Sequence, residues 1–238
     1  MQKSNFDRQN GARAGRVDIY AGIHKAVRAF LCDTLTRLAR LDLEDPDELS
    51  GAVLQVRELL AFCEHHIHNE ERFVHPAMEV RQPGSSVDTA DDHLHHAQSV
   101  AAMLADCATM ETQRGAERDA AWRRLQRQLA QFTGDNLLHM DVEETANNAV
   151  LHACYMDSEL IGLHQQILAA MPPQELAAGL RWILIASSPA ERAEVMAGIR
   201  ADAPPPVFDA MLEMARQVLD ARAWDKLAAS LSPLRIAA

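Results

Sequence analysis

Apolar residues recur in alternating steps of three and four along four long stretches of the chain, the spacing of an amphipathic α-helix. The stretches cover residues 17–43, 46–80, 85–113 and 116–151, and short polar turns with proline or glycine separate most of them. Long helices joined by short connections pack as antiparallel neighbours. The pattern therefore predicts an all-α fold built on an antiparallel four-helix bundle.

In the last third of the chain, the predicted helices are shorter. Shorter amphipathic segments follow one another at residues 157–171, 173–187, 188–200, 205–219 and 221–231, with prolines or capping serines at several of their starts. We therefore expect an additional C-terminal helical subdomain. The predicted division is a flexible N-terminus at 1–16, the bundle at 17–153 and a helical extension at 154–238.

On each of the four predicted long helices, the apolar residues form a stripe along one face, and each stripe includes polar residues over a short stretch. The inward positions there carry His24 on the first stripe, His66 and Glu70 on the second, His93 and His96 on the third, and His139 and Glu143 on the fourth. Beyond the glutamates, the same period continues the stripes through Phe73 and Ala77, and through Ala146 and Val150. His65, His68 and His95 fall off the stripes, so we expect them to be solvated.

The spacing of the two inward pairs suits metal binding. Residues four apart lie on one face of a helix, so His66 with Glu70, and His139 with Glu143, can each point an imidazole and a carboxylate at one site. Burying such groups without a partner costs several kcal/mol for each charge, and coordination to a cation removes that cost. A single inward histidine is more often a hydrogen-bonded core residue, but the whole set favours a dinuclear metal site.

Composition narrows the class of protein. The chain has 23 Lys and Arg against 34 Asp and Glu, a net charge of −11, which argues against nucleic acid or an anionic membrane as a partner. No apolar run is long enough to span a bilayer, and the first residues lack a secretion signal, so we expect a cytoplasmic protein. The four cysteines form no CxxC motif and are expected to be reduced and packed in the core.

Several local motifs resemble those of hemerythrin-like proteins of the bacterial histidine–histidine–glutamate (HHE) cation-binding type. The resemblance runs over residues 17–153. It is carried by the segment from Glu70 to Met78, which is similar to the family's Glu-Glu, hydrophobic, Pro pattern, by Asp92-His93, and by the segment from His139 to Glu144. His75 stands where the family more often has an aromatic residue, which leaves open whether this imidazole lies near the site or at the surface.

The resemblance implies a four-helix bundle that holds a non-haem di-iron centre. It implies histidines as terminal ligands, two glutamates that bridge the irons, and a coordination position left open for dioxygen or another small ligand. The implied ligands are His24, His66, Glu70, His93, His96, His139 and Glu143. Zinc or manganese could replace iron, because imidazole and carboxylate suit all three. Carboxylates that orient the imidazoles are expected nearby, and Glu71 and Glu144 could be such groups or simply solvated.

We therefore expect a protein that binds or senses dioxygen, nitric oxide or peroxide, with no catalytic residues, and with C-terminal helices that could meet a protein partner. Two alternatives stay open: metal storage or detoxification, and a di-iron enzyme with peroxidase-like or oxidase-like activity. Di-iron enzymes of the ferritin-like kind use more carboxylates, in Glu-x-x-His order. This chain has the reverse order and a wider spacing, which favours the binding protein.

Overall fold

The computed structural model describes residues 15–232, so the predicted flexible segment 1–16 lies outside the described residues except for its last two positions. All regular secondary structure within residues 15–232 is helical, and no strand occurs there, as the apolar pattern predicts. The first part consists of α1 (Ala21–Ala39), α2 (Pro46–Asn69), η2 (Glu70–Val74), α3 (His75–Arg81), α4 (Val87–Thr112), α5 (Ala116–Val142), η3 (Glu143–Asn147) and α6 (Asn148–Cys154).

Side-chain caps decide where the first two helices begin. α2 starts at Pro46 as predicted, because the Asp45 carboxylate accepts hydrogen bonds from the backbone N–H groups of Asp47 and Glu48 at 2.9 and 3.1 Å. α1 starts at residue 21 rather than 17. The carboxylate of Asp18 accepts hydrogen bonds from the N–H groups of residues 20 and 21, and this cap fixes the start of the helix there.

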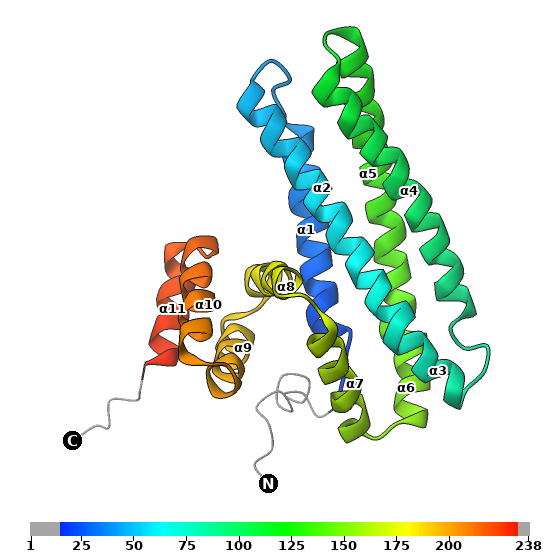
Figure 1. Ribbon diagram of the computed structural model, residues 1–238, viewed down its shortest axis with the longest axis vertical. Helices are drawn as coiled ribbons and strands as arrows, with labels where there is room; N and C mark the ends of the chain where they lie inside the picture. Colours follow the sequence, from blue (N-terminus) through cyan, green and yellow to red (C-terminus); the bar gives the residue numbers. More distant parts are fainter. Residues whose placement is uncertain (1–14, 233–238) are drawn as a thin grey trace. The chain divides into compact units, whose positions relative to one another are not determined.

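The long helices α1, α2, α4 and α5 run side by side and form the four-helix bundle (Figure 1). Fully buried leucine, valine, methionine and phenylalanine side chains from the apolar stripes fill its interior, among them Leu31, Val56, Met103 and Phe132. Each such side chain contributes roughly 1.5–3 kcal/mol on burial. The indole N–H of Trp122 also donates to the Leu38 carbonyl at 3.1 Å, which ties α5 to the end of α1.

Two five-residue π-helical turns interrupt the bundle helices, and both begin at a predicted ligand glutamate. A π-turn takes in one residue more than an α-turn. After Glu70 the buried positions are therefore Val74 and Met78, and the predicted continuation through residues 73 and 77 is wrong by one residue. After Glu143 the same shift buries residues 147 and 151 instead of 146 and 150.

The chain forms two compact units. One is Val27–Cys154, and the other joins the described residues up to Ala26 with those from Tyr155 onward. The boundary near residue 26 falls within α1, which is continuous. Whether residues 17–153 and 154–238 are separate domains, as predicted, stays a prediction.

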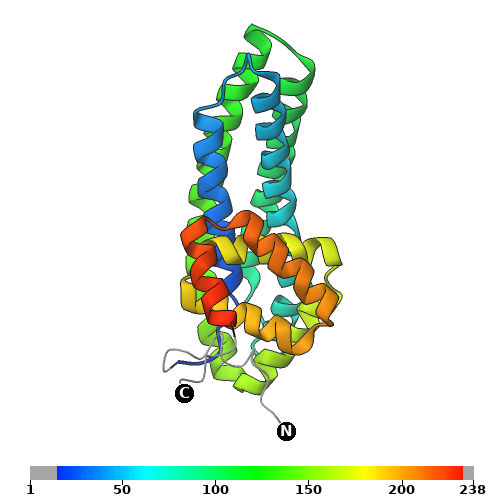
Figure 2. The ribbon, with the colours of Figure 1, turned by 90° about the vertical axis from the view of Figure 1, so that its left-hand side faces the viewer.

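The C-terminal helices lie close to the predicted segments. They are α7 (Asp157–Ala170), α8 (Pro173–Ala186), α9 (Pro189–Asp202), α10 (Pro205–Val218) and α11 (Ala221–Leu231). Figure 2 shows α8 to α11, coloured yellow to red, gathered into one group. Their shared core contains Leu184, Met196, Ala215 and Leu227, so these helices have an apolar core of their own.

The cysteines are free thiols, but the prediction that all of them are core-packed is wrong for Cys32, which is exposed. Cys63 and Cys107 are buried, and burial raises the pKa of their thiols to about 12 and about 11. These two thiols are therefore protonated at neutral pH and act as small apolar groups. Within residues 15–232, none of the helices is long and apolar enough to cross a membrane.

Candidate metal centre

Two histidine–glutamate pairs face the bundle interior, one where α2 passes into η2 and one where α5 passes into η3. His66 Nε2 lies 3.2 Å from a carboxylate oxygen of Glu70, and His139 Nε2 lies 3.4 Å from a carboxylate oxygen of Glu143. Both glutamates are buried, with exposed fractions of 3% and 0%. The i,i+4 spacing that brings each pair together was visible in the sequence, because the helix is regular up to the glutamate.

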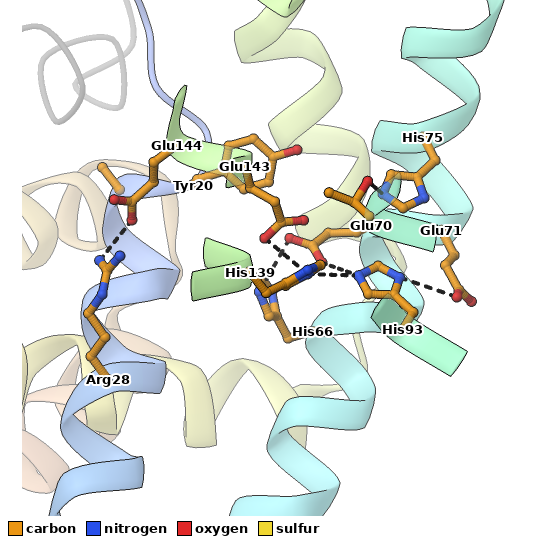
Figure 3. Close-up of polar contacts among 12 residues, drawn as sticks. Tyr20, Arg28, His66, Glu70, Glu71, His75, His93, His139, Glu143 and Glu144 are labelled. Carbon is orange, nitrogen blue, oxygen red and sulfur yellow. Dashed lines mark hydrogen bonds and ion pairs between the residues drawn. The ribbon is translucent and has the colours of Figure 1, made fainter. Parts of the chain in front are cut away.

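α4 adds His93 to the same interior. Its Nε2 lies 3.1 Å from Nε2 of His139 and 3.5 Å from a carboxylate oxygen of Glu70 (Figure 3). Two neutral imidazoles that face each other through Nε2 can share at most one proton at that contact. The arrangement therefore presents nitrogen lone pairs and carboxylate oxygens to a common interior space.

The potential donor atoms fall into two groups within the part of the chain that the structure describes. The first contains His24, His66, Glu70 and Glu143, and the second contains Glu70, His93, His139 and Glu143. Within each group the ligand atoms lie within 4.8 Å of one another. The two glutamates belong to both groups, and each group has two histidines of its own.

Exposed carboxylates hold the outer nitrogens of two of these histidines. Glu71 lies 3.3 Å from Nδ1 of His93, and Asp92 lies 3.2 Å from Nδ1 of His139. A carboxylate on Nδ1 favours the tautomer with its proton there, which leaves Nε2 free to coordinate a metal. The sequence left the role of Glu71 open and gave Asp92 no role beyond its place in the Asp92-His93 motif, because these contacts depend on how the helices pack.

Burial and neighbouring charge set the protonation of the cluster. Burial, helped by His139, lowers the pKa of His93 to about 3, so this imidazole is neutral at physiological pH. Burial alone would also lower the pKa of His139. The hydrogen bond and charge of Glu143, together with the hydrogen bond of Asp92, instead raise this pKa above its usual value. Neutral His93 has the form that a metal ligand needs, and a cation would displace a proton from His139.

Each donor group fits a divalent cation. Two buried carboxylates whose oxygens lie within 4.8 Å of each other repel by roughly 3 kcal/mol at an effective dielectric constant of about 20. Cations between them would convert that repulsion into attraction. Imidazole nitrogen and carboxylate oxygen are donors that iron, manganese and zinc accept.

A protein-family model, the hemerythrin HHE cation binding domain, matches residues 16–148. The matched part is more than half of the chain and contains both donor groups. The chain belongs to the hemerythrin HHE family. Searches among curated proteins and among solved structures gave no match. Membership in the hemerythrin family indicates cation binding, and the buried donors identify the place in the bundle where cations would be held.

In this hemerythrin-family protein, six of the seven predicted ligands belong to the two donor groups, and His96 does not. The His96 ring is buried and packs edge-on against His139 and Phe132, with centroid distances of 5.1 and 5.5 Å. Its Nδ1 makes no hydrogen bond with any described residue. Burial, helped by His139, lowers the pKa of His96 to about 4. The apolar stripe predicted correctly that His96 points inward, but it could not predict which inward histidines belong to the same donor group.

The histidines that lie off the stripes are exposed, as predicted: His65, His68 and His95. Glu144, whose role the sequence left open, forms an ion pair with Arg28 at 2.8 Å. His75 lies beside the centre rather than at the surface. It is buried to 6% exposure and stacks on His93.

Proposed function

We propose that this protein holds a non-haem di-iron centre and uses it to bind or sense dioxygen or a related small ligand such as nitric oxide or peroxide. One observation carries the proposal: the two donor groups share Glu70 and Glu143 and differ only in their histidines. Shared carboxylates between two separate histidine pairs are what two bridged cations require.

Each part of the donor set has a distinct task. His24 and His66 would serve one ion, His93 and His139 the other, and the two glutamates both. Bound iron would supply redox-active ions with coordination positions left for a small ligand. Glu71 and Asp92 would hold the rings of His93 and His139 so that Nε2 faces the ions.

The histidine-rich donor set favours a binding or sensing role over the two alternatives. Di-iron enzymes of the ferritin-like kind surround their ions with more carboxylates, whereas each group here pairs two imidazoles with two shared carboxylates. The donors are mostly buried rather than spread over a surface, which suits a fixed centre better than metal storage. A storage protein should take up far more metal than the centre can hold.

Metal analysis tests the centre directly. Protein purified without oxygen and reconstituted with Fe(II) should contain about two iron ions per chain, because two donor groups are available. His66→Ala and His139→Ala should each lower the iron content strongly, while the exposed neighbours His65→Ala and His68→Ala should match the wild type. One iron per chain, none, or equal losses in all four variants would contradict the dinuclear proposal.

The optical spectrum tests the role. The reduced di-iron protein should develop a ligand-to-metal charge-transfer band when dioxygen or nitric oxide is admitted, and removal of the gas should reverse the change if the protein is a reversible binder. Catalytic turnover of peroxide at a constant rate would favour the enzyme alternative. Uptake of many irons per chain without a gas-dependent band would favour storage.

A further inference from the structure

The π-turn η2 and the first residue of α3 place three side chains around His93. Glu70 approaches Nε2 of the ring at 3.5 Å, Glu71 approaches Nδ1 at 3.3 Å, and His75 covers one face. The two consecutive glutamates lie in the wide turn η2, which begins at Glu70 and ends just before His75, and they reach opposite edges of the His93 ring. Figure 3 shows these side chains around His93.

His75 makes the most specific of these contacts. Its ring lies parallel to that of His93, with an interplanar angle of 9° and a centroid distance of 5.1 Å. Its Nε2 lies 3.3 Å from Oγ1 of Thr89, a buried residue of α4. The Thr89 hydroxyl in turn donates to the Ser86 carbonyl at 3.1 Å. The His75 ring is therefore held at its edge while its face lies against His93.

His75 is poorly placed to be a ligand itself. A metal ion held by Nε2 of His93 would be reached along a lone pair in the plane of that ring, whereas the lone pair of His75 lies in a nearly parallel plane. In agreement with this geometry, neither donor group contains His75. The ring also differs from an apolar core side chain: burial lowers its pKa, and its Nε2–H donates a compensating hydrogen bond to the Thr89 hydroxyl, whose own proton goes to Ser86.

We propose that His75 is a positioning residue of the metal centre: held by Thr89, it fixes the plane of the His93 ring and so the direction in which Nε2 of His93 points. The inference rests on the proposed centre, because it concerns how a ligand of that centre is oriented. Loss of a group that orients a metal-bound imidazole typically lowers metal affinity by about 10- to 100-fold.

Three variants of the full chain separate the contributions of the stack and the hydrogen bond. His75→Ala removes both, His75→Phe keeps an aromatic face against His93, and Thr89→Val removes only the bond. Anaerobic Fe(II) binding, measured by competition with a chelator, should weaken by about tenfold or more in His75→Ala. His75→Phe should recover most of that loss, and Thr89→Val should lie between.

A matched cavity variant controls for general loosening of the bundle. Met103 is fully buried on α4, ten residues after His93. Met103→Ala should lower the unfolding temperature but leave Fe(II) affinity near that of the wild type. Wild-type affinity in His75→Ala, equal losses in His75→Ala and His75→Phe, or an equal loss in Met103→Ala would each overturn the inference.

The metal-free protein separates this inference from the proposed function. If wild-type protein binds no iron, the proposed function fails, and the ring of His93 can still be followed by ¹H–¹⁵N NMR of the histidine side chains. Wild type and His75→Phe should then give one sharp His93 signal, whereas His75→Ala should give a shifted or broadened one. An unchanged His93 signal in His75→Ala would overturn the positioning role on its own.

Discussion

Each imidazole of the centre has two nitrogens, and the chain assigns them different tasks. In His93 and His139, Nδ1 faces an exposed carboxylate and Nε2 faces the interior. Burial lowers the pKa of His93 and so keeps its ring neutral. At His139, the hydrogen bond and charge of Glu143 oppose burial and raise the pKa. The protonation and orientation of these two side chains therefore follow from burial and from the carboxylates that contact them.

His96 provides a test at the level of one residue. The sequence predicts it as a ligand, but its donor atoms lie in neither group. On this geometry we expect His96→Ala to keep about two irons per chain, and His93→Ala to lose at least one. Metal analysis of both variants after anaerobic reconstitution makes the comparison. If His96→Ala loses as much iron as His93→Ala, the longer ligand set implied by the family resemblance is correct.

At the level of elements, the two π-turns are the main departure from regular helix. η2 and η3 begin at Glu70 and Glu143, the two glutamates common to both donor groups. π-turns are rare, occur mostly as single turns inside α-helices, and are frequently found at functional sites. Each π-turn begins at the glutamate of a histidine–glutamate pair, so the same local structure occurs at both carboxylates that the donor groups share.

Deleting one residue from a π-turn should restore an α-helix without moving the core. If the exposed Thr145 is removed, residues 147 and 151 fall three and seven positions after Glu143, which is the α-helical spacing. We expect unchanged helix content by circular dichroism and an unfolding temperature of the metal-free protein close to the wild type. Iron affinity should fall by roughly tenfold or more, because the support of Glu143 changes.

A deletion in the regular part of α5 is the control. Removing the exposed Ala130 would rotate all later positions by about 100°, since an α-helix advances 3.6 residues per turn. This variant should lose stability as well as iron. If deletion of Thr145 leaves iron affinity intact, the π-turn at Glu143 has no role in the centre.

At the level of the whole molecule, residues near the N-terminus belong with the C-terminal helices. Arg16 forms an ion pair with Asp157, and Lys25 forms one with Glu191 at the start of α9. The hydrogen bond from Lys25 lowers the pKa of Glu191 to about 2. These pairs are partly exposed, so each is worth at most about 1 kcal/mol. They connect distant parts of the sequence but contribute little to stability.

Truncation after residue 154 tests whether the C-terminal helices take part in the chemistry. All six grouped donors precede that point, so we expect the shortened chain to bind about two irons and to show the same gas-dependent band. Its unfolding temperature should fall by a few degrees, because the ion pairs with residues 16 and 25 are lost. A shortened protein that binds iron but no longer responds to gas would show that the tail contributes to the site.

Much of the fold could be predicted from hydrophobic periodicity alone. The bundle helices, the five C-terminal helices and the inward direction of His24, His93, His96 and His139 follow from which positions repeat every three or four residues. The prediction failed just after Glu70 and Glu143. A π-turn shifts the buried positions that follow it by one residue, and the apolar pattern before the turn does not indicate this shift.

The sequence by itself determined the helices, the buried stripe on each, and the two pairs that a regular helix turn brings together. These are local properties, set by spacing along one helix. The tertiary structure alone decided that Glu70 and Glu143 share two groups, that His96 joins neither, and that His75 stacks on His93. Such contacts join different helices, so they depend on the packing of the bundle and have no fixed spacing in the chain.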